Sequence, residues 1–459
     1  MHIIHHGGSQ GVTGSCHELV IDEHNSILID CGLFQGSEAG NNLAHRPEID
    51  FPLDRVKGLI LTHVHLDHVG RLPYLFAAGF TGPIYCSHPS ARLLPLVVED
   101  AIKVGFTSDT RLIKQFVTLV NDHLIPLAYH KRMEIALTGA DKLAIRLNRA
   151  GHIFGSAFVQ CRVTEAGRRT DIIFSGDLGA PYTPLLPAPD QPYGCDLLVL
   201  ESTYGDRLHG PRRDRRRRLQ AIIEGALANG GTILIPAFSI GRTQEILYEL
   251  EGILAEQQQK GNETWRRLPI FLDSPLADKV TKVYRELSPW WDKEAHARLR
   301  RGRQPLAFSQ LQHIEDHAAH LANVDNLRNG GQPAIVIAAG GMCTGGRIVN
   351  YLEAMLPSTN NDVLFVGYQA AGTPGRDIQQ YGPTGGYVML NGRRITIRAK
   401  IHSLAGYSAH ADQGNLVNFV KRMRKKPAEI ILVHGEADAK QSLKSRLAEV
   451  VNSKVRIPA

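Results

Sequence analysis

The most chemically informative part of the sequence is the stretch His63-Val64-His65-Leu66-Asp67-His68, which places three imidazoles and one carboxylate within six residues. It follows an apolar segment, residues 57–62, that is typical of a buried strand. In an extended continuation of that strand, residues two apart face the same side, so His63 and His65 can converge on one ion. A turn after Leu66 would direct the aspartate and the last histidine toward a second ion. Imidazole with carboxylate suits zinc, and this spacing at a strand end disfavours unrelated surface histidines.

Further polar residues lie at the ends of other predicted strands or in adjacent loops. They are Asp30, His152, Asp177, Glu201, His410 and His434. Taken singly, a strand-end aspartate or a histidine beside glycine is more often structural than catalytic. Together these residues repeat one arrangement, in which a buried strand delivers a polar ligand to one rim of a sheet.

The elements that must position these residues change in character along the chain. The first 200 residues or so combine short strands with a few helices, whereas helices and buried strands alternate after about residue 206. That alternation is typical of a parallel sheet, and the earlier pattern returns from about residue 396. We therefore predict a domain formed by residues 1–205 and 396–459, with a second domain, residues 206–395, inserted into it.

Length and composition are those of an ordinary globular protein, with 459 residues, 43% hydrophobic and 21% charged. The N-terminus lacks the features of a signal peptide, and no stretch reaches the roughly 18–20 apolar residues that a membrane span needs. We therefore expect a cytoplasmic protein without membrane association. The six cysteines are scattered, with no C-x-x-C pair, which disfavours a disulfide framework or a thiolate zinc site.

The charge distribution favours an anionic partner, because the formal net charge is +7. Basic residues gather in three runs, within residues 212–218, 300–303 and 421–426. Any one run can be a solvated helix face. Three such runs on a basic protein favour nucleic acid as the partner.

Taken together, the motifs resemble those of the metallo-β-lactamase superfamily and, within it, the β-CASP nucleases. The H-x-H-x-D-H stretch, His152 and Asp177 match the superfamily motifs, and Glu201, His410 and His434 match the three extra motifs of the β-CASP branch. The resemblance also covers residues 236–242, 273–276 and 340–347, and it spans nearly the whole chain. It implies an αββα sandwich with an inserted α/β β-CASP domain, whose parallel sheet is flanked by helices.

The resemblance also implies a pair of zinc ions. The first would be bound by His63, His65 and His152, the second by Asp67, His68 and His434, with Asp177 bridging both. Asp30 is expected behind them, orienting a ligand without touching metal. Two zinc ions about 3.5–4 Å apart can lower the pKa of a shared water and align a phosphodiester.

The residues expected to act in catalysis are Asp67, Glu201 and His410. His410 would donate a proton to the leaving oxygen, and Glu201 would hold its imidazole in position.

Phosphate contacts are expected from the glycine-rich segment 340–347, in which the amides of Gly345 and Gly346 and the side chain of Arg347 could bind an anion. Such glycine pairs are more often only turns. Ser408 is either a hydroxyl donor to the same phosphate or a turn residue, and the sequence gives both equal weight.

Three functions are compatible with these features. The first is a zinc-dependent ribonuclease that takes single-stranded RNA into a cleft between the domains and cuts it endonucleolytically, with 5′ exonuclease action as a further mode. The second is another hydrolase of the same fold. Such an enzyme would need neither the Glu201 and His410 side chains nor the inserted domain, so the insertion argues against it. The third is an inactive RNA-binding scaffold, which is disfavoured because every ligand is present. RNA-processing members of the family resemble this chain in having a histidine at the position of His434, and this resemblance favours RNA as the substrate. The oligomeric state stays open, a homodimer included.

Overall fold

The structure is a computed structural model that describes residues 1–35, 47–139, 141–210, 214–330, 332–404 and 406–458. The chain forms two compact units. The first unit comprises Met1–Pro181, Pro187–Leu208 and His410–Ala459, and the second comprises Tyr182–Leu186 and His209–Ala409. No helix in the described part of the chain is long and apolar enough to cross a membrane.

The first unit contains two sheets. One has the strand order β1-β2-β3-β4-β5-β6, with bounds His2–Gly7, Cys16–Val20, Ser26–Ile29, Val56–Ile60, Ile84–Ser87 and Leu124–Leu127. The other has the order β21-β20-β11-β10-β9-β8-β7. From β7 to β11 its strands are Arg132–Ile135, Lys142–Arg149, Ala157–Glu165, Arg168–Phe174 and Leu197–Glu201; β20 is Glu429–Val433 and β21 is Lys454–Arg456.

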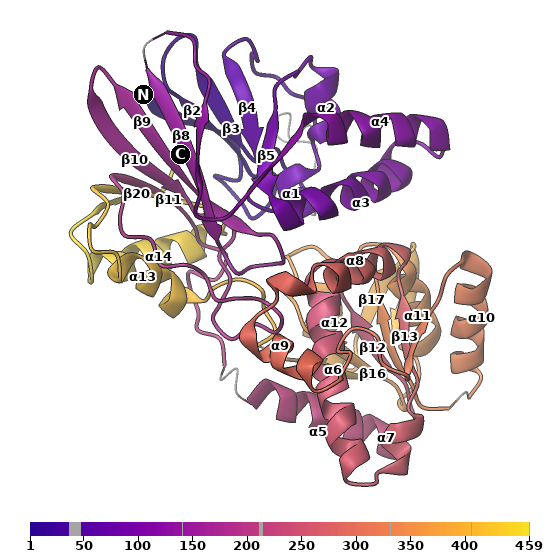
Figure 1. Ribbon diagram of the computed structural model, residues 1–459. Helices are drawn as coiled ribbons and strands as arrows, with labels where there is room; N and C mark the ends of the chain where they lie inside the picture. The colour runs from indigo at the N-terminus through magenta and orange to yellow at the C-terminus, as the bar shows by residue number, and fades with distance from the viewer. Residues whose placement is uncertain (36–46, 140, 211–213, 331, 405, 459) are drawn as a thin grey trace. The chain divides into compact units, whose positions relative to one another are not determined.

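The two sheets face each other across a shared core, and helices cover their outer faces (Figure 1). The helices of the first sheet are α1 (Leu66–Val69), α2 (Leu72–Ala77), α3 (His88–Gly105) and α4 (Thr110–His123); those of the second are α13 (Gln413–Lys421) and α14 (Ala437–Ala448). Strand β10 shows how the covering of both sheet faces is reflected in the sequence. Ile172 and Phe174 point into the core between the sheets, while Ile173 points toward α13 and α14. Because both faces are covered, the strand is apolar at successive positions.

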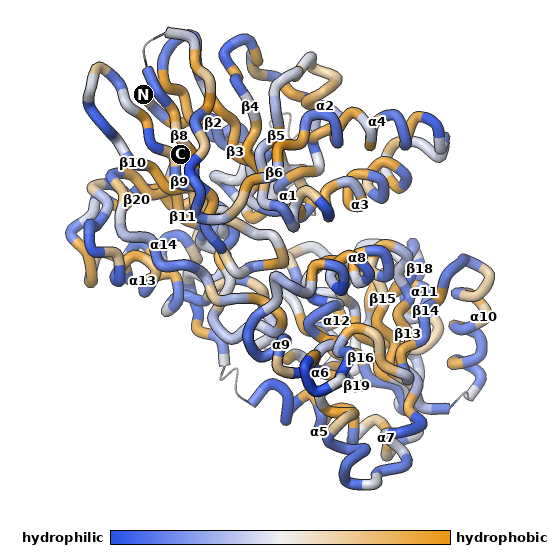
Figure 2. The backbone as a smooth tube through the Cα atoms, viewed as in Figure 1, coloured by the Kyte–Doolittle hydropathy of each residue, from blue (hydrophilic) through white to orange (hydrophobic). Residues whose placement is uncertain are grey.

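The second unit contains a six-stranded sheet in which every pairing is parallel. Its order is β14-β13-β15-β12-β16-β19. Strands β12 to β16 are Ile233–Pro236, Ile270–Asp273, Leu311–His313, Ile335–Ala338 and Asp362–Phe365, and β19 is Lys400–Ser403. Figure 2 shows apolar residues concentrated on these strands, whereas much of α5 is hydrophilic.

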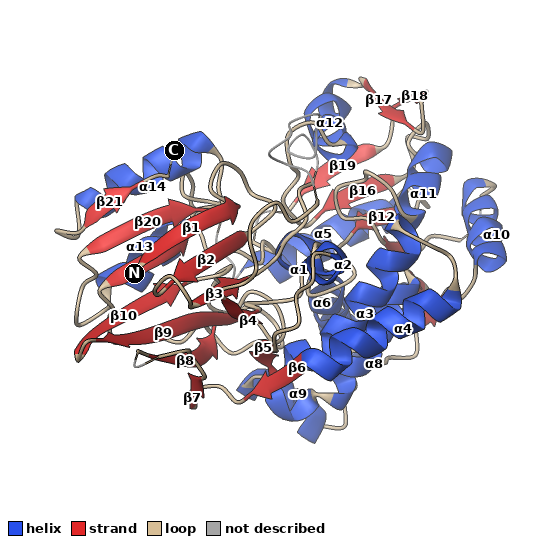
Figure 3. Ribbon diagram, turned by 90° about the horizontal axis from the view of Figure 1, so that it is seen from above, coloured by secondary structure: helices blue, strands red, loops and turns tan. Residues whose placement is uncertain are grey.

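Helices flank this parallel sheet. Those from α5 to α9 are Arg215–Ala228, Arg242–Gln259, Glu263–Arg267, Pro275–Glu286 and Lys293–Arg300, and those from α10 to α12 are His317–Arg328, Arg347–Met355 and Pro374–Tyr381; two short 3₁₀ turns are Ser288–Trp290 and Gly382–Thr384. A separate hairpin pairs β17 (Tyr387–Leu390) with β18 (Arg393–Thr396), beside α12 (Figure 3). The predicted fold class, a sandwich domain combined with a helix-flanked parallel sheet, is confirmed.

Candidate metal centre

The candidate ligands all lie in the first unit, at the carboxyl ends of strands that are neighbours in the two sheets. In the second sheet, β10, β11 and β20 are parallel neighbours, so Asp177, Glu201 and His434 are delivered to one edge. In the first sheet, β3 and β4 are parallel neighbours and lead to Asp30 and to the segment that begins with His63. The turn that carries the last two residues of the H-x-H-x-D-H stretch is the beginning of helix α1.

The first group of candidate ligands comprises three imidazoles and one carboxylate, His63, His65, His152 and Asp177. His63 Nε2 lies 3.1 Å from His65 Nδ1, and His65 Nδ1 lies 3.2 Å from His152 Nε2. Asp177 Oδ2 is 3.6 Å from the Nε2 atoms of His63 and His152. Four ligand atoms around a tetrahedral zinc lie about 3.3 Å apart. The spacing of these side chains therefore fits one such ion.

The second group comprises Asp67, His68, Asp177 and His434. His68 Nε2 lies 3.3 Å from Asp177 Oδ1, and His434 Nε2 lies 3.4 Å from Asp67 Oδ2. Both His68 Nε2 and Asp177 Oδ1 are buried, and neither makes a hydrogen bond to any described residue. A cation between them would satisfy both atoms. Asp177 directs one carboxylate oxygen to each group, so it is placed to bridge a pair of ions.

Asp30 is held behind the second group by its own hydrogen bonds. Its Oδ2 lies 2.7 Å from His68 Nδ1 and accepts a bond of 2.7 Å from the Thr62 hydroxyl, while Oδ1 accepts from the Thr62 amide. This contact fixes the His68 ring with Nε2 toward Asp177, as a residue that orients a ligand must do.

Three supporting hydroxyl groups were not predicted from the sequence. Thr62 connects Asp30 to the rings of His63 and His68. Thr203 Oγ1 lies 3.1 Å from His434 Nδ1. Ser156 Oγ accepts a bond from the backbone amide of His152. For Thr62 and Thr203 the available signal was their place beside a predicted ligand strand, which alone does not distinguish them from other threonines.

Glu201 and His410 form a third group with Asp177. His410 Nδ1 lies 3.3 Å from Glu201 Oε2 and 3.8 Å from Asp177 Oδ2. Glu201 is buried, and its carboxylate also accepts from the amides of Leu178 and Thr203. The backbone amide of Ala411 donates to the Leu178 carbonyl at 2.6 Å, which fixes the segment carrying His410.

The electrostatics favour metal binding by the imidazoles of the first group. Burial lowers the pKa of His63 and His152 well below the usual value and that of His65 to about 4. These imidazoles are therefore neutral, as a metal ligand must be.

For His68 and His434, burial lowers the pKa but nearby carboxylates, Asp177 foremost, outweigh it, so the pKa of His68 lies well above its usual value and that of His434 is about 9. Burial alone would raise the pKa of Asp177, but the imidazoles of His434 and His68 hold it well below its usual value. For His410, burial lowers the pKa, but the charges of Glu201 and Asp177 outweigh burial and raise it.

The predicted phosphate contacts Gly345, Gly346, Arg347 and Ser408 belong to the second unit. There, Arg347 donates from Nη1 to Asp273 Oδ1 at 2.6 Å and to the carbonyl of Ile314. Its guanidinium is therefore committed to a buried carboxylate. Gly345 has open space around its Cα, and Gly346 adopts a φ of 82°.

The basic runs are partly structural. Arg212 and Arg213 lie outside the described residues. Arg215 pairs with Glu249 at 2.8 Å, Arg216 with Glu256 at 2.7 Å, Arg303 with Glu251 at 2.5 Å and Lys425 with Asp196 at 2.5 Å. Arg217 also pairs, with Asp214 at 3.1 Å, but its side chain is 82% exposed. Several cations of the basic runs are therefore neutralised within the protein, and the preference for a nucleic-acid partner stays a prediction.

Comparison with known proteins identifies the family. Residues 13–220 match the model of the metallo-beta-lactamase superfamily, residues 243–378 that of the Beta-Casp domain, and residues 394–458 that of the Zn-dependent metallo-hydrolase RNA specificity domain. Ribonuclease TTHA0252 of Thermus thermophilus is 37% identical, over 98% of this chain and 96% of that protein.

More distant relatives extend beyond the length of this chain. The transcription termination factors FttA of Methanocaldococcus jannaschii and Thermococcus kodakarensis are 30% and 32% identical, over 94% and 96% of this chain. The matched region is 66% and 67% of those proteins, so the chain spans about two thirds of their length. With the ligand geometry, these matches confirm the resemblance: the chain belongs to the β-CASP family of the metallo-β-lactamase superfamily and is a metal-dependent hydrolase.

Proposed function

We propose that this protein is a zinc-dependent ribonuclease that hydrolyses phosphodiester bonds of single-stranded RNA with two zinc ions and His410 as general acid. Endonucleolytic cleavage is the proposed mode, and 5′ exonuclease action is a second mode of the same site. The observation that carries the proposal is the sharing of Asp177 by two ligand groups, with the Glu201–His410 pair beside them. A homodimer and a cytoplasmic location stay predictions.

RNA as the substrate is supported by the comparisons. A relative that matches almost end to end is named a ribonuclease, and the C-terminal family model is named for RNA specificity. The formal net charge of +7 suits a polyanion.

The residues of the chain divide the chemistry between them. The six other ligands and Asp177 would hold the two ions, which supply Lewis acidity toward the phosphate and an activated water when bound. His410 directs Nδ1 toward Glu201, so Nε2 is the atom from which a proton would pass to the leaving oxygen. Glu201 stays in place because two backbone amides bond its carboxylate.

The proposal is tested by incubating zinc-loaded protein with circular RNA and with end-labelled linear RNA. Cutting of the circle establishes endonuclease action. Release of mononucleotides from the 5′ end of the linear RNA, with the circle left intact, would show that the protein is an exonuclease and not an endonuclease. An Asp177→Asn variant is the matched control, because it keeps a side chain of similar shape but weakens both ligand groups. Failure of the zinc-loaded wild type to cleave either RNA would overturn the proposal.

A further inference from the structure

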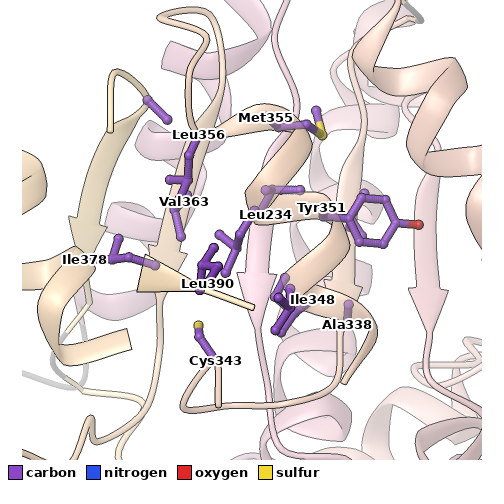
Figure 4. Close-up of a cluster of buried hydrophobic side chains, with 14 of the residues drawn as sticks. Leu234, Ala338, Cys343, Ile348, Tyr351, Met355, Leu356, Val363, Ile378 and Leu390 are labelled. Carbon is purple, nitrogen blue, oxygen red and sulfur yellow. The ribbon is translucent and has the colours of Figure 1, made fainter. Parts of the chain in front are cut away.

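The hairpin β17–β18 of the second unit has two different faces. On the inner face, Val388 and Leu390 are almost fully buried in the core beside the parallel sheet. Figure 4 shows the Leu390 side chain in that cluster, close to Val363 and Leu234. On the outer face, Tyr387 is 46% and Met389 49% exposed. The core therefore anchors the inner face of the hairpin and leaves two large side chains of the outer face about half exposed.

An arginine completes the outer face. The register pairs Tyr387 with Thr396 and Met389 with Arg394, so Tyr387 and Arg394 are diagonal neighbours. The guanidinium carbon of Arg394 lies 4.1 Å from the centre of the Tyr387 ring, which is a cation–π contact. Tyr381 adjoins this pair, because its carbonyl accepts from the Gly386 amide, and it is 44% exposed.

The hairpin and the residues after it are strongly cationic. Arg393, Arg394, Arg398 and Lys400 are exposed, and none of them pairs with a carboxylate of the described residues. The acidic neighbours of this segment include Glu353, which accepts a hydrogen bond from Asn391 at the turn, and Asp362, the register partner of Lys400, which is buried and contacts His402 at 2.6 Å. This contrasts with the basic runs, where several arginines are neutralised by buried or half-buried glutamates.

We propose that the outer face of the β17–β18 hairpin is a binding surface for single-stranded RNA, on a different unit from every metal ligand. Bases would stack on Tyr387 and on the Arg394 guanidinium, while Arg398 and Lys400 would contact phosphates. Exposed aromatic rings next to unpaired cations are the combination that binds single strands without reading sequence. Unpaired positive charge favours this polyanion over a protein partner. The inference rests on the proposed ribonuclease function for the identity of the polymer.

The test compares a long uridine-rich RNA, about 30 nucleotides, with a short one of about 6 nucleotides. Binding is measured by fluorescence anisotropy on the zinc-loaded full chain carrying His410→Ala, and cleavage on the chain with His410 intact. Tyr387→Ala should weaken binding of the long RNA about five- to a hundredfold, whereas Tyr387→Phe keeps the ring and should bind normally. Cleavage of the short RNA should not change in either variant.

The phosphate contacts are tested by salt dependence. Each contact to a single strand contributes about −0.7 to the slope of log affinity against log salt. The double variant Arg398→Gln/Lys400→Gln should therefore flatten the slope by about 1.4. Arg111→Gln is the control, since Arg111 is an 87% exposed arginine of the first unit that already pairs with Asp109 at 3.2 Å, and it should leave the slope unchanged.

The outcomes separate this inference from the proposed function. Normal long-RNA binding by Tyr387→Ala, with cleavage intact, overturns the hairpin surface alone. Absent cleavage, with binding that still depends on Tyr387, overturns the ribonuclease function alone. A change of oligomeric state in Tyr387→Ala without loss of RNA affinity would instead assign the surface to a protein contact and overturn the inference.

Discussion

His410 Nδ1 lies 3.3 Å from the Glu201 carboxylate, which is itself fixed by a 2.6 Å hydrogen bond from the Leu178 amide. This contact gives the imidazole one defined orientation next to Asp177, the carboxylate common to both candidate ligand groups. His410 at this position could be a proton donor or a metal ligand, because both roles would have similar surroundings.

The variant His410→Ala distinguishes these roles. If His410 is a general acid, the variant should retain both zinc ions and lose about 10²–10⁴-fold in the single-turnover cleavage rate. Glu201→Gln should show a smaller loss, because the imidazole remains and only its orientation is weakened. His434→Ala is the contrasting variant and should lose zinc as well as rate. Loss of a zinc ion from His410→Ala, or cleavage at the wild-type rate, would show that the acid assignment is wrong.

Metal content provides a second prediction. Protein purified without chelator should contain close to two zinc ions per chain by elemental analysis, and chelation should lower the melting temperature because zinc binds the folded state. Occupancy should fall as the pH is lowered, since metal binding needs neutral imidazoles and acid protonates them. The melting temperature of Asp177→Asn should respond much less to zinc. A reproducible lack of metal, with no gain in activity on adding zinc or manganese, would falsify the dinuclear centre.

The sequence indicates the candidate ligands but not the hydroxyl groups beside them, for a physical reason. Four candidate ligands lie within one six-residue stretch, so their spacing can be read from the sequence and indicates two ligand groups without knowledge of the fold. Thr203 lies beside His434 only because β11 and β20 are neighbours, and these two residues are 231 positions apart. Arg347 is similarly paired with Asp273, 74 positions away. Contacts between residues so far apart in the sequence depend on the order of the strands in the sheet. The sequence of one short apolar strand does not determine that order.

Strand β19 is a further example. The sequence grouped residues 396–459 with the first domain, whereas Lys400–Ser403 pairs with β16 at the edge of the second unit's sheet. The four residues Lys-Ile-His-Ser carry no strong strand pattern. Their pairing is set by the neighbour that β16 offers rather than by their own composition.

The hydroxyl of Thr62 should matter to zinc affinity although it is not a ligand. Thr62→Val keeps the shape of the side chain but removes its bond to Asp30, which orients His68. Changes of this kind typically weaken metal binding about 10–100-fold. Competition with a chromophoric chelator measures the effect. Thr164→Val, on β9, removes a hydroxyl that has no link to the centre and should bind zinc normally. Equal zinc affinity in the two variants would exclude the supporting role.

Arg215 and Arg217 should behave differently although they are two positions apart in the same basic run. The side chains of Arg215 and its partner Glu249 are 11% and 5% exposed, so Arg215→Ala leaves a buried carboxylate unpaired. Loss of one partner of a buried pair costs about 3–5 kcal/mol. Arg217 is 82% exposed, and Arg217→Ala should change the free energy of unfolding by no more than about 0.5 kcal/mol. Urea unfolding of both variants provides the comparison. Equal stability of the two variants would contradict the structural role of Arg215.

Arg217→Ala also tests whether RNA follows this helix. If it does, the variant should flatten the salt dependence of RNA binding by about 0.7, whereas an unchanged slope would assign Arg217 to a solvated helix face.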